Sequence, residues 1–341
     1  MCMVSHIIPV YNGGEQIRRT VKSILNQTFR DFELIIIDDG STDRATVELV
    51  DELAKQDARI KVVHQTNHGV YETSDTGMRL ASGKYVYLCG QDDYLHPQLF
   101  ELATNLCERH KLDYIALRWQ NVQADSMPET LHYVEHMLPV DIVDNNLTDD
   151  VSFFKALEQV HTDAWAQFMR RELSVRFPSR VTGQTARTFK CVDASKRWGV
   201  IRAPLYYYTK TNFGGSLMHK PIYADWVDEL HCEMANVYDL AKTWSPERFI
   251  VMRKMHVVPG VRTVFHLVKR SSKRLGRSDK VKLWQAFSRM AADFVFVRRI
   301  PINQLGLKHY FEYMFVAFFY GGIKNPEVNI QGFHGSSKRA K

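Results

Sequence analysis

The sequence lacks the features that mark disulfide-bonded, zinc-binding or membrane-spanning proteins. Its five cysteines are scattered and never form a Cys-x-x-Cys pair, which argues against structural zinc and favours a reducing compartment. No window of 18 residues is both uncharged and apolar, and the nearest stretch, 310–322, is too short and contains Glu312. The first residues lack the basic and long apolar segments of a signal peptide. We therefore expect a cytoplasmic protein.

Acidic residues are scarce in the last hundred positions. Residues 242–341 contain 20 Lys and Arg against 5 Asp and Glu, whereas the net charge of the whole chain is +7. Aromatic residues lie between the basic ones at 262–277 and 280–299, which is typical of helices that bind an anionic membrane surface. The alternative is a helical appendage whose aromatic residues form its own core. No DNA- or RNA-binding motif accompanies the charge, so nucleic acid is not an expected partner.

Strand and helix patterns alternate through the first hundred residues. The run Leu-Ile-Ile-Ile at 34–37 is typical of a parallel strand buried on both faces. This order predicts an α/β fold with a doubly wound, mostly parallel sheet and flanking helices. The strand patterns cover 6–12, 32–43, 59–65 and 83–89, and the helix patterns cover 14–27, 45–55 and 72–82.

The pattern changes twice along the rest of the chain. Between 100 and 220 it is less regular, and beyond 221 the strand signals fade and basic helical patterns follow one another. We therefore predict an α/β domain at 1–220 and a basic, mainly helical region at 221–341. The expected elements are helices at 97–110, 151–159, 222–242, 246–275, 279–298 and 304–320, and strands at 114–122 and 203–209.

Two acid pairs follow predicted strands, Asp38-Asp39 and Asp92-Asp93. In open α/β sheets, ligands bind beyond the carboxyl ends of the strands. Adjacent carboxylates in that position are suited to a divalent cation and a phosphate. No Gly-x-Gly-x-x-Gly follows the first strand, which argues against a nicotinamide-dependent enzyme.

Three segments resemble the inverting family 2 glycosyltransferases of the GT-A fold, which is Rossmann-like. They are PVYN (9–12), SILNQTFRDFELIIIDDGSTD (23–43) and ASGKYVYLCGQDDYLHP (81–97), and their spacing also matches. GVYETSDTG (69–77) is similar to a further family segment, with Asp75 in place of the usual Asn. The resemblance implies a nucleotide-sugar-binding half at 1–100 and an acceptor half at 101–220.

The resemblance implies that a nucleotide sugar, a UDP-sugar above all, binds at these segments. Pro9 and Tyr11 would line the slot for the base, and the Asp39 carboxylate would accept hydrogen bonds from the base or the ribose. Asp38 would share this task or cap the following turn, and both acids could instead only close a turn. The implied donor-binding residues are Pro9, Tyr11, Asp38, Asp39, Asp75, Gln91 and Asp93.

A divalent cofactor, Mg²⁺ or Mn²⁺, is implied at Asp92. Such a cation, held by one or two carboxylates and by diphosphate oxygens, offsets charge on the leaving nucleoside diphosphate. Gly90 stands where an acid would complete an Asp-x-Asp clamp, so we expect few protein ligands and phosphate-dependent binding. The alternative is that Asp92 and Asp93 cap the helix that begins near Pro97.

A later segment, 205–219, resembles the final strand and phosphate loop of the family. His219 is implied there as a further metal or phosphate ligand, and Lys210 and Ser216 could also reach phosphate. A surface loop histidine is the alternative interpretation of His219.

Inverting transfer also needs a base that deprotonates the acceptor hydroxyl. The family's base position falls on Gln184, within 176–190, and an amide cannot take up a proton. The candidate substitutes are Asp163, His161 and Asp193, each of which could also be structural.

The sequence thus predicts a metal-dependent hexosyl- or hexosaminyltransferase. It would move a sugar from the nucleotide donor to a glycan or lipid-linked acceptor in surface-polysaccharide synthesis, at the inner face of the cell membrane. The alternative is a catalytically degenerate GT-A protein that binds a nucleotide or glycan, or that scaffolds another transferase. The amide at Gln184 supports the alternative, whereas the acids at Asp39 and Asp92 count against it.

Overall fold

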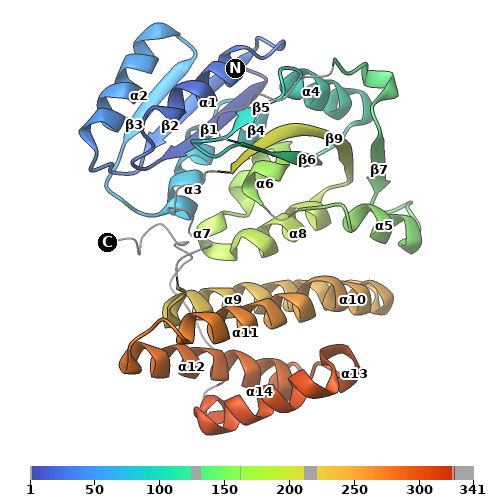
Figure 1. Cartoon of the computed structure of the whole chain (residues 1–341). Helices are drawn as coiled ribbons and strands as arrows, with labels where there is room; N and C mark the ends of the chain where they lie inside the picture. Colours follow the sequence, from blue (N-terminus) through green and yellow to red (C-terminus); the bar gives the residue numbers. More distant parts are fainter. Residues whose placement is uncertain (1, 124–131, 162, 211–220, 325, 327–341) are drawn as a thin grey trace. The chain divides into compact units, whose positions relative to one another are not determined.

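The structure is a computed structural model that describes residues 2–123, 132–161, 163–210, 221–324 and 326 (Figure 1). The described chain divides into two compact units. The first contains the residues up to Arg180 and the segment from Arg187 to the end of β9 (Arg197–Lys210). The second contains residues 181–186 and the helices from α9 (Ala224–Ala241) onward.

The first half of the sheet is parallel, as the sequence predicts. Its strands lie in the order β3-β2-β1-β4, and every pair in this order is parallel. All seven residues of β2 are buried, which agrees with its continuous apolar run. The elements of this half are β1 (Val4–Val10), α1 (Gln16–Leu25), β2 (Phe32–Asp38), α2 (Arg44–Gln56), β3 (Ile60–His64), α3 (Val70–Leu80) and β4 (Tyr85–Leu88).

Helices cover both faces of this half. Ile8 and Ile36 belong to one core cluster with apolar residues of α1, α2 and α4 (Leu99–His110). The adjacent residue Ile7 points the other way, because successive strand side chains alternate between faces. There α3 approaches so closely that a Cβ on Gly77 would lie 2.4 Å from Cγ2 of Ile7. The sheet is therefore buried on both sides.

The second half of the sheet is mixed. The order continues from β4 through β8, β6 and β9 to β5, with β7 paired to β9. Among these strands only β6 and β9 pair in parallel. The elements are β5 (Tyr94–Leu95), β6 (Tyr114–Gln123), η1 (Glu135–Met137), β7 (Val140–Asp144), α5 (Asp150–Leu157), η2 (Ala164–Ala166), β8 (Gln167–Arg170), α6 (Arg171–Arg176), α7 (Ser179–Thr182) and α8 (Gln184–Ala194).

The sequence prediction misses β7, β8 and the helices from α6 to α8. β8 has four residues, which is too short for a period of two to be recognised. β7 carries Asp141 and Asp144, so its sequence resembles an acidic loop, yet it pairs with β9. Both strands owe their conformation to partners that are distant in the sequence.

The second unit is helical, as predicted (Figure 1). Its long helix α12 packs against α9, α11 and α14. No helix among the described residues is long and apolar enough to cross a bilayer. The elements after α9 are α10 (Pro246–Met252), the π-helical turn η4 (Arg253–Val257), α11 (Val258–Ser272), α12 (Arg277–Ala292), the π-helical turn η5 (Asp293–Val297), α13 (Ile302–Leu305), α14 (Leu307–Phe319) and η6 (Gly322–Lys324).

Candidate active site

Three segments that are far apart in the sequence meet at the carboxyl ends of β1, β2 and β4. Val10 pairs with Asp38, and the N–H of Asp39 donates to the carbonyl of Val10 at 2.8 Å. The N–H of Tyr11 donates to Oε1 of Gln91 at 2.9 Å. Pro9 is half-buried within β1, and Tyr11 is half-buried just after it. The parallel sheet therefore brings the expected donor-binding segments together.

Asp39 is buried and held entirely by protein donors. Its carboxylate accepts hydrogen bonds from Nε2 of Gln65 (2.8 Å) and from the backbone N–H groups of His68 (2.8 Å) and Gly69 (2.9 Å). These bonds fix the loop between β3 and α3 at the edge of the site. Asp39 therefore shapes the rim of the expected nucleotide pocket.

Asp38 closes a turn, which was the alternative interpretation of this residue. Its carboxylate accepts from the N–H of Ser41 at 3.0 Å and contacts Nδ1 of His64 at 2.9 Å. Gly40 follows with a φ of +69°, and a Cβ there would lie 2.8 Å from the backbone N of Asn67. Only glycine fits this turn without strain.

Asn12 is a residue of the site region that sequence reasoning missed. Its Oδ1 accepts from the N–H groups of Thr42 (2.8 Å) and Asp43 (2.9 Å), which joins the end of β1 to the turn after β2. Its φ of +48° is a left-handed conformation that Asn tolerates better than most residues. The motif PVYN was the signal that could have identified it.

The two acids after β4 have different surroundings. Asp93 is 2% exposed, accepts a hydrogen bond from the hydroxyl of Tyr206, and accepts the N–H of Thr209 at 2.7 Å. Apart from its own backbone N–H, no hydrogen-bond donor to the Asp92 carboxylate occurs among the described residues. Arg19 donates to the backbone carbonyl of Asp92 at 3.0 Å. Asp93 is thus a positioning residue, and Asp92 is the acid left available to a ligand.

The electrostatics of the pair suit a cation. Burial raises the pKa of both carboxyls, and the charge of Asp92 raises the pKa of Asp93 further. A Cβ on Gly90 would lie 2.7 Å from Oδ2 of Asp93 and 3.0 Å from Oδ1 of Asp92, so a side chain there would require the two carboxylates to shift. Among the described residues no group of three metal-ligating side chains occurs. The donor set thus fits a hard cation completed by phosphate and water.

Asp163 lies beside the same strand that holds Asp93. Two residues later, Trp165 stacks on Tyr206 at 6.1 Å and on Tyr208 at 5.5 Å between ring centroids. Burial raises the pKa of Tyr208, and the charges of Asp93, Asp92 and Asp163 raise it further. All three carboxylates therefore lie close enough to Tyr208 for their charges to act on it.

The Asp163 side chain has the properties expected of a base. It is half-buried, and burial raises its pKa. No group among the described residues donates a hydrogen bond to its carboxylate, whereas its backbone carbonyl accepts the N–H of Ala166 at 3.0 Å and Nε2 of Gln167 at 3.1 Å. A carboxylate with no protein partner can take a proton from an incoming hydroxyl.

The other base candidates have other surroundings. Gln184 begins α8 and belongs to the second unit. Nε2 of His161 accepts from Arg118 at 2.6 Å, and burial and that charge lower the pKa of His161. Asp193 is exposed on α8. These contacts favour Asp163 among the candidates.

Asp75, another predicted donor-binding residue, has a structural role away from the acid pair. Asp75 is buried and accepts the N–H groups of Ser179 and Arg180, each at 2.8 Å, so it caps α7. His219 lies outside the described residues, as does Ser216. Lys210 is exposed at the end of β9.

Comparisons with known proteins agree with this geometry. A sequence model of glycosyl transferase family 2 matches residues 5–172, which include the acid pair and Asp163. Residues 5–172 therefore belong to glycosyl transferase family 2. This family 2 domain comprises all the parallel strands of the first unit except β9.

Two curated relatives extend the match. The uncharacterized glycosyltransferase EpsJ of Bacillus subtilis (strain 168) is 31% identical over 179 residues, 51% of this chain and 49% of that protein. The poly(ribitol-phosphate) beta-N-acetylglucosaminyltransferase TarP of Staphylococcus aureus (strain N315) is 26% identical over 219 residues, 63% of this chain and 65% of that protein. The matches thus span about half of the first relative and just under two thirds of the second.

A solved structure covers nearly the whole chain. The crystal structure of S. aureus TarS 1-349 in complex with UDP-GlcNAc has a TM-score of 0.67 and 17% identity, and covers 98% of this chain and 97% of that one. At this identity the likeness concerns the fold, and it extends from the family 2 domain into the helical unit.

Proposed function

We propose that this chain is a glycosyltransferase that moves a sugar from a UDP-sugar donor to a hydroxyl of a glycan or lipid-linked acceptor, in the synthesis of a surface polysaccharide. One observation carries the proposal. Asp92 and Asp163 both belong to the segment that matches family 2, their carboxylates accept no hydrogen bond from any other described residue, and the charges of both raise the pKa of Tyr208.

The donor would bind in the half formed by residues 1–100, and the acceptor in the half formed by residues 101–220. Pro9, Tyr11 and Gln91 would line the nucleotide pocket, with Asp39 fixing its rim. We favour a hexosamine as the transferred sugar. The support is the likeness to TarP, whose name specifies N-acetylglucosamine, and to the fold of TarS, whose crystal structure contains UDP-GlcNAc.

In the proposed mechanism Asp163 is the base of a single displacement with inversion. The acceptor oxygen would form a bond to the anomeric carbon as the bond from that carbon to the diphosphate oxygen breaks. The proton of the acceptor hydroxyl would pass to the Asp163 carboxylate, and UDP would leave with the bonding electron pair. Tyr206 and Thr209 would keep Asp93 in place beside Asp92 throughout.

A divalent cation, Mg²⁺ or Mn²⁺, would be held by Asp92 and the donor diphosphate. When bound, it would neutralise the charge that develops on the leaving diphosphate. With so few protein ligands, its affinity would depend on the nucleotide.

We further propose that the protein works at the inner surface of the cell membrane, where a lipid-linked acceptor would be found. The support is the excess of basic residues after position 242. Lys and Arg near an anionic leaflet contribute about 1 kcal/mol each to binding.

The competing function is that of a catalytically degenerate subunit, and Gln184 at the family's base position favours it. An assay with UDP-GlcNAc, Mn²⁺ and a glycan acceptor, in which the release of UDP is measured, distinguishes the enzyme from the degenerate subunit. We expect turnover by the wild type and its loss in Asp163→Asn, with UDP binding retained. Binding of UDP without turnover of any UDP-sugar would establish the degenerate subunit, and absence of both would refute the proposed donor.

A further inference from the structure

The outer face of α14 is apolar and exposed to solvent. Leu307, Phe311, Phe315 and Phe318 recur every three or four residues along it and are between 58% and 71% exposed. On the opposite face Tyr313 is fully buried, with its ring 5.1 Å from that of Phe265 in α11. The inner face thus packs α14 onto the unit, whereas the outer side chains remain more than half exposed.

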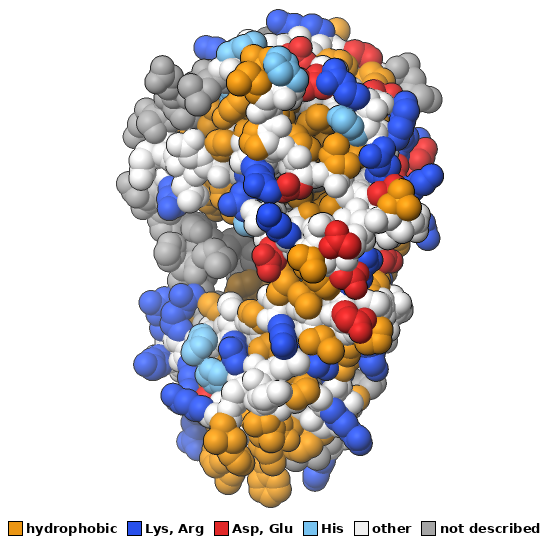
Figure 2. All heavy atoms as spheres, turned by 90° about the vertical axis from the view of Figure 1, so that its right-hand side faces the viewer, with side chains coloured by type: hydrophobic (Ala, Val, Ile, Leu, Met, Phe, Trp, Pro, Cys, Tyr) orange, Lys and Arg blue, Asp and Glu red, His pale blue; other side chains and the backbone are white. Residues whose placement is uncertain are grey.

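Scattered exposed apolar residues are ordinary, but contiguous ones indicate a binding surface. Phe319, 64% exposed, and Tyr320, 36% exposed, extend the same patch. Figure 2 shows hydrophobic side chains gathered at the lower edge of the second unit, with Lys and Arg side chains on the faces beside them. The patch therefore adjoins a strongly basic surface.

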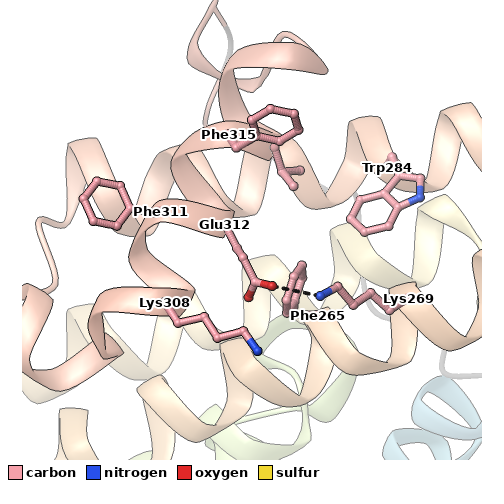
Figure 3. Close-up of a pocket in the computed structure, with 8 residues that line it drawn as sticks. Phe265, Lys269, Trp284, Lys308, Phe311, Glu312 and Phe315 are labelled. Atoms are coloured by element: carbon pink, nitrogen blue, oxygen red, sulfur yellow. Dashed lines mark hydrogen bonds and ion pairs between the residues drawn. The ribbon is translucent and has the colours of Figure 1, made fainter.

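A groove of ≈ 530 Å³ runs along one side of α14. Its walls are mainly apolar and its charged residues are Lys269, Lys308 and Glu312 (Figure 3). Nζ of Lys269 lies 3.0 Å from Oε1 of Glu312, and Nδ1 of His309 lies 3.1 Å from Oε2. The one acid of α14 is thus neutralised by its neighbours, and Lys308 leaves the groove with positive charge.

We propose that α14 inserts its outer face into an anionic bilayer, with Lys308 at the level of the lipid headgroups. Apolar and aromatic side chains of an interfacial helix enter the boundary between headgroups and acyl chains, and basic side chains beside them meet lipid phosphates. The charge favours a lipid surface over a second copy of this chain, because the region after position 242 is strongly basic and two copies would bring like charges together. This inference names the surface for the membrane location in the proposed function and rests on that location.

The test is cosedimentation of the full chain with vesicles of phosphatidylglycerol or of phosphatidylcholine. We expect the wild type to bind phosphatidylglycerol vesicles and to be released by 1 M NaCl, at which charges are screened beyond about 3 Å. The double variant Phe315→Ser/Phe318→Ser should bind about tenfold more weakly or worse, because two apolar side chains no longer insert. Lys308→Gln should weaken binding to a smaller extent.

The matched control is Leu147→Ser/Val151→Ser, which alters two apolar residues of the first unit that are 84% and 79% exposed. It should bind vesicles like the wild type. Equal binding by the wild type and the Phe315/Phe318 variant would overturn the inference, as would equal binding to both lipids. A wild-type oligomer in ultracentrifugation that the double variant converts to monomer, without any vesicle binding, would assign the face to a second copy instead.

UDP binding measured without vesicles keeps the two proposals apart. It should be the same in the wild type and in both double variants, since none of the substituted residues belongs to the candidate active site. Vesicle binding without UDP binding would refute the proposed donor and leave the membrane surface standing.

Discussion

At the scale of single residues, the site is defined by which acids the protein already uses. Asp38, Asp39, Asp75 and Asp93 all accept hydrogen bonds from protein donors, so they position loops, turns and strands. Asp92 and Asp163 retain carboxylates for a ligand or a proton. In the proposed mechanism Asp92 would serve the donor and Asp163 the acceptor hydroxyl, and the charges of both raise the pKa of Tyr208.

We predict that Asp163→Asn lowers kcat by about 10² to 10⁴ fold, the range typical of a general base, with little change in UDP affinity. The pKa of Asp163 is raised by burial, so in the wild type kcat should rise with pH as this carboxyl deprotonates. A pH profile of kcat measures this. The exposed Asp193→Asn is the control and should behave like the wild type; an Asp163→Asn variant with an unchanged profile would contradict the assignment.

Asp92→Asn should remove the part of UDP affinity that depends on Mn²⁺. We expect a loss of about tenfold or more with Mn²⁺ present, equivalent to about 1.4 kcal/mol, and no difference in EDTA. Calorimetric titration of UDP under both conditions provides the measurement. Glu48→Gln, on the exposed surface of α2, is the control, because it also removes one negative charge. Equal Mn²⁺ dependence in Asp92→Asn and the wild type would exclude Asp92 as a ligand.

At the scale of elements, the close approach of α3 to β1 sets the position of the loop that Asp39 binds. α3 begins directly after Gly69, whose N–H donates to Asp39, and Gly77 lies against Ile7 of β1. A displaced α3 would therefore displace the rim of the pocket.

Gly77→Ala should destabilise the protein by about 1 to 3 kcal/mol, because the new methyl group overpacks a tight contact. The better helix propensity of Ala, worth about 1 kcal/mol, offsets only part of this cost. Urea denaturation measures the difference. Gly276→Ala is the control, since a Cβ there meets nothing within 4 Å. If Gly77→Ala were as stable as the control, the contact would not be tight.

At the scale of the whole molecule, the chain crosses between the two units more than once. Residues 181–186 belong to the helical unit although the residues on both sides belong to the sheet unit. Glu233 of α9 accepts the N–H of Thr185, and Asn236 donates to the carbonyl of Thr182 at 3.3 Å. Contacts from α9 thus help to fix the start of α8.

A chain that ends at Tyr223 should therefore be cut rapidly by trypsin at Arg180 and Arg187, whereas the full chain resists at these bonds. The reason is that the truncated chain lacks Glu233 and Asn236. Mass spectrometry of early digests identifies the cleavage sites. Cleavage at Arg44, 90% exposed at its side chain, serves as the reference rate in both chains. Equal protection of residues 181–186 in the two chains would show that α9 is not needed there.

Much of this fold is predictable from local sequence. Buried strands such as β2 read as uninterrupted apolar runs, and the long helices of the second unit read as amphipathic patterns, because both periodicities arise from local backbone geometry. The short β8 and the acidic β7 were missed, because their conformation depends on pairing with strands far away in the sequence.

The sequence by itself determined the parallel half-sheet, the acids at its carboxyl edge and the basic helical region. The tertiary structure alone decided which acids remain available. Asp92 and Asp93 are neighbours, yet Tyr206 and Thr209, more than a hundred residues later, engage only Asp93. Trp165, two residues after Asp163, likewise stacks on Tyr206 and Tyr208, about forty residues later, and so brings this segment against β9. Hydrogen-bond partners and ring contacts are set by distance in space, which residue spacing along a chain does not encode.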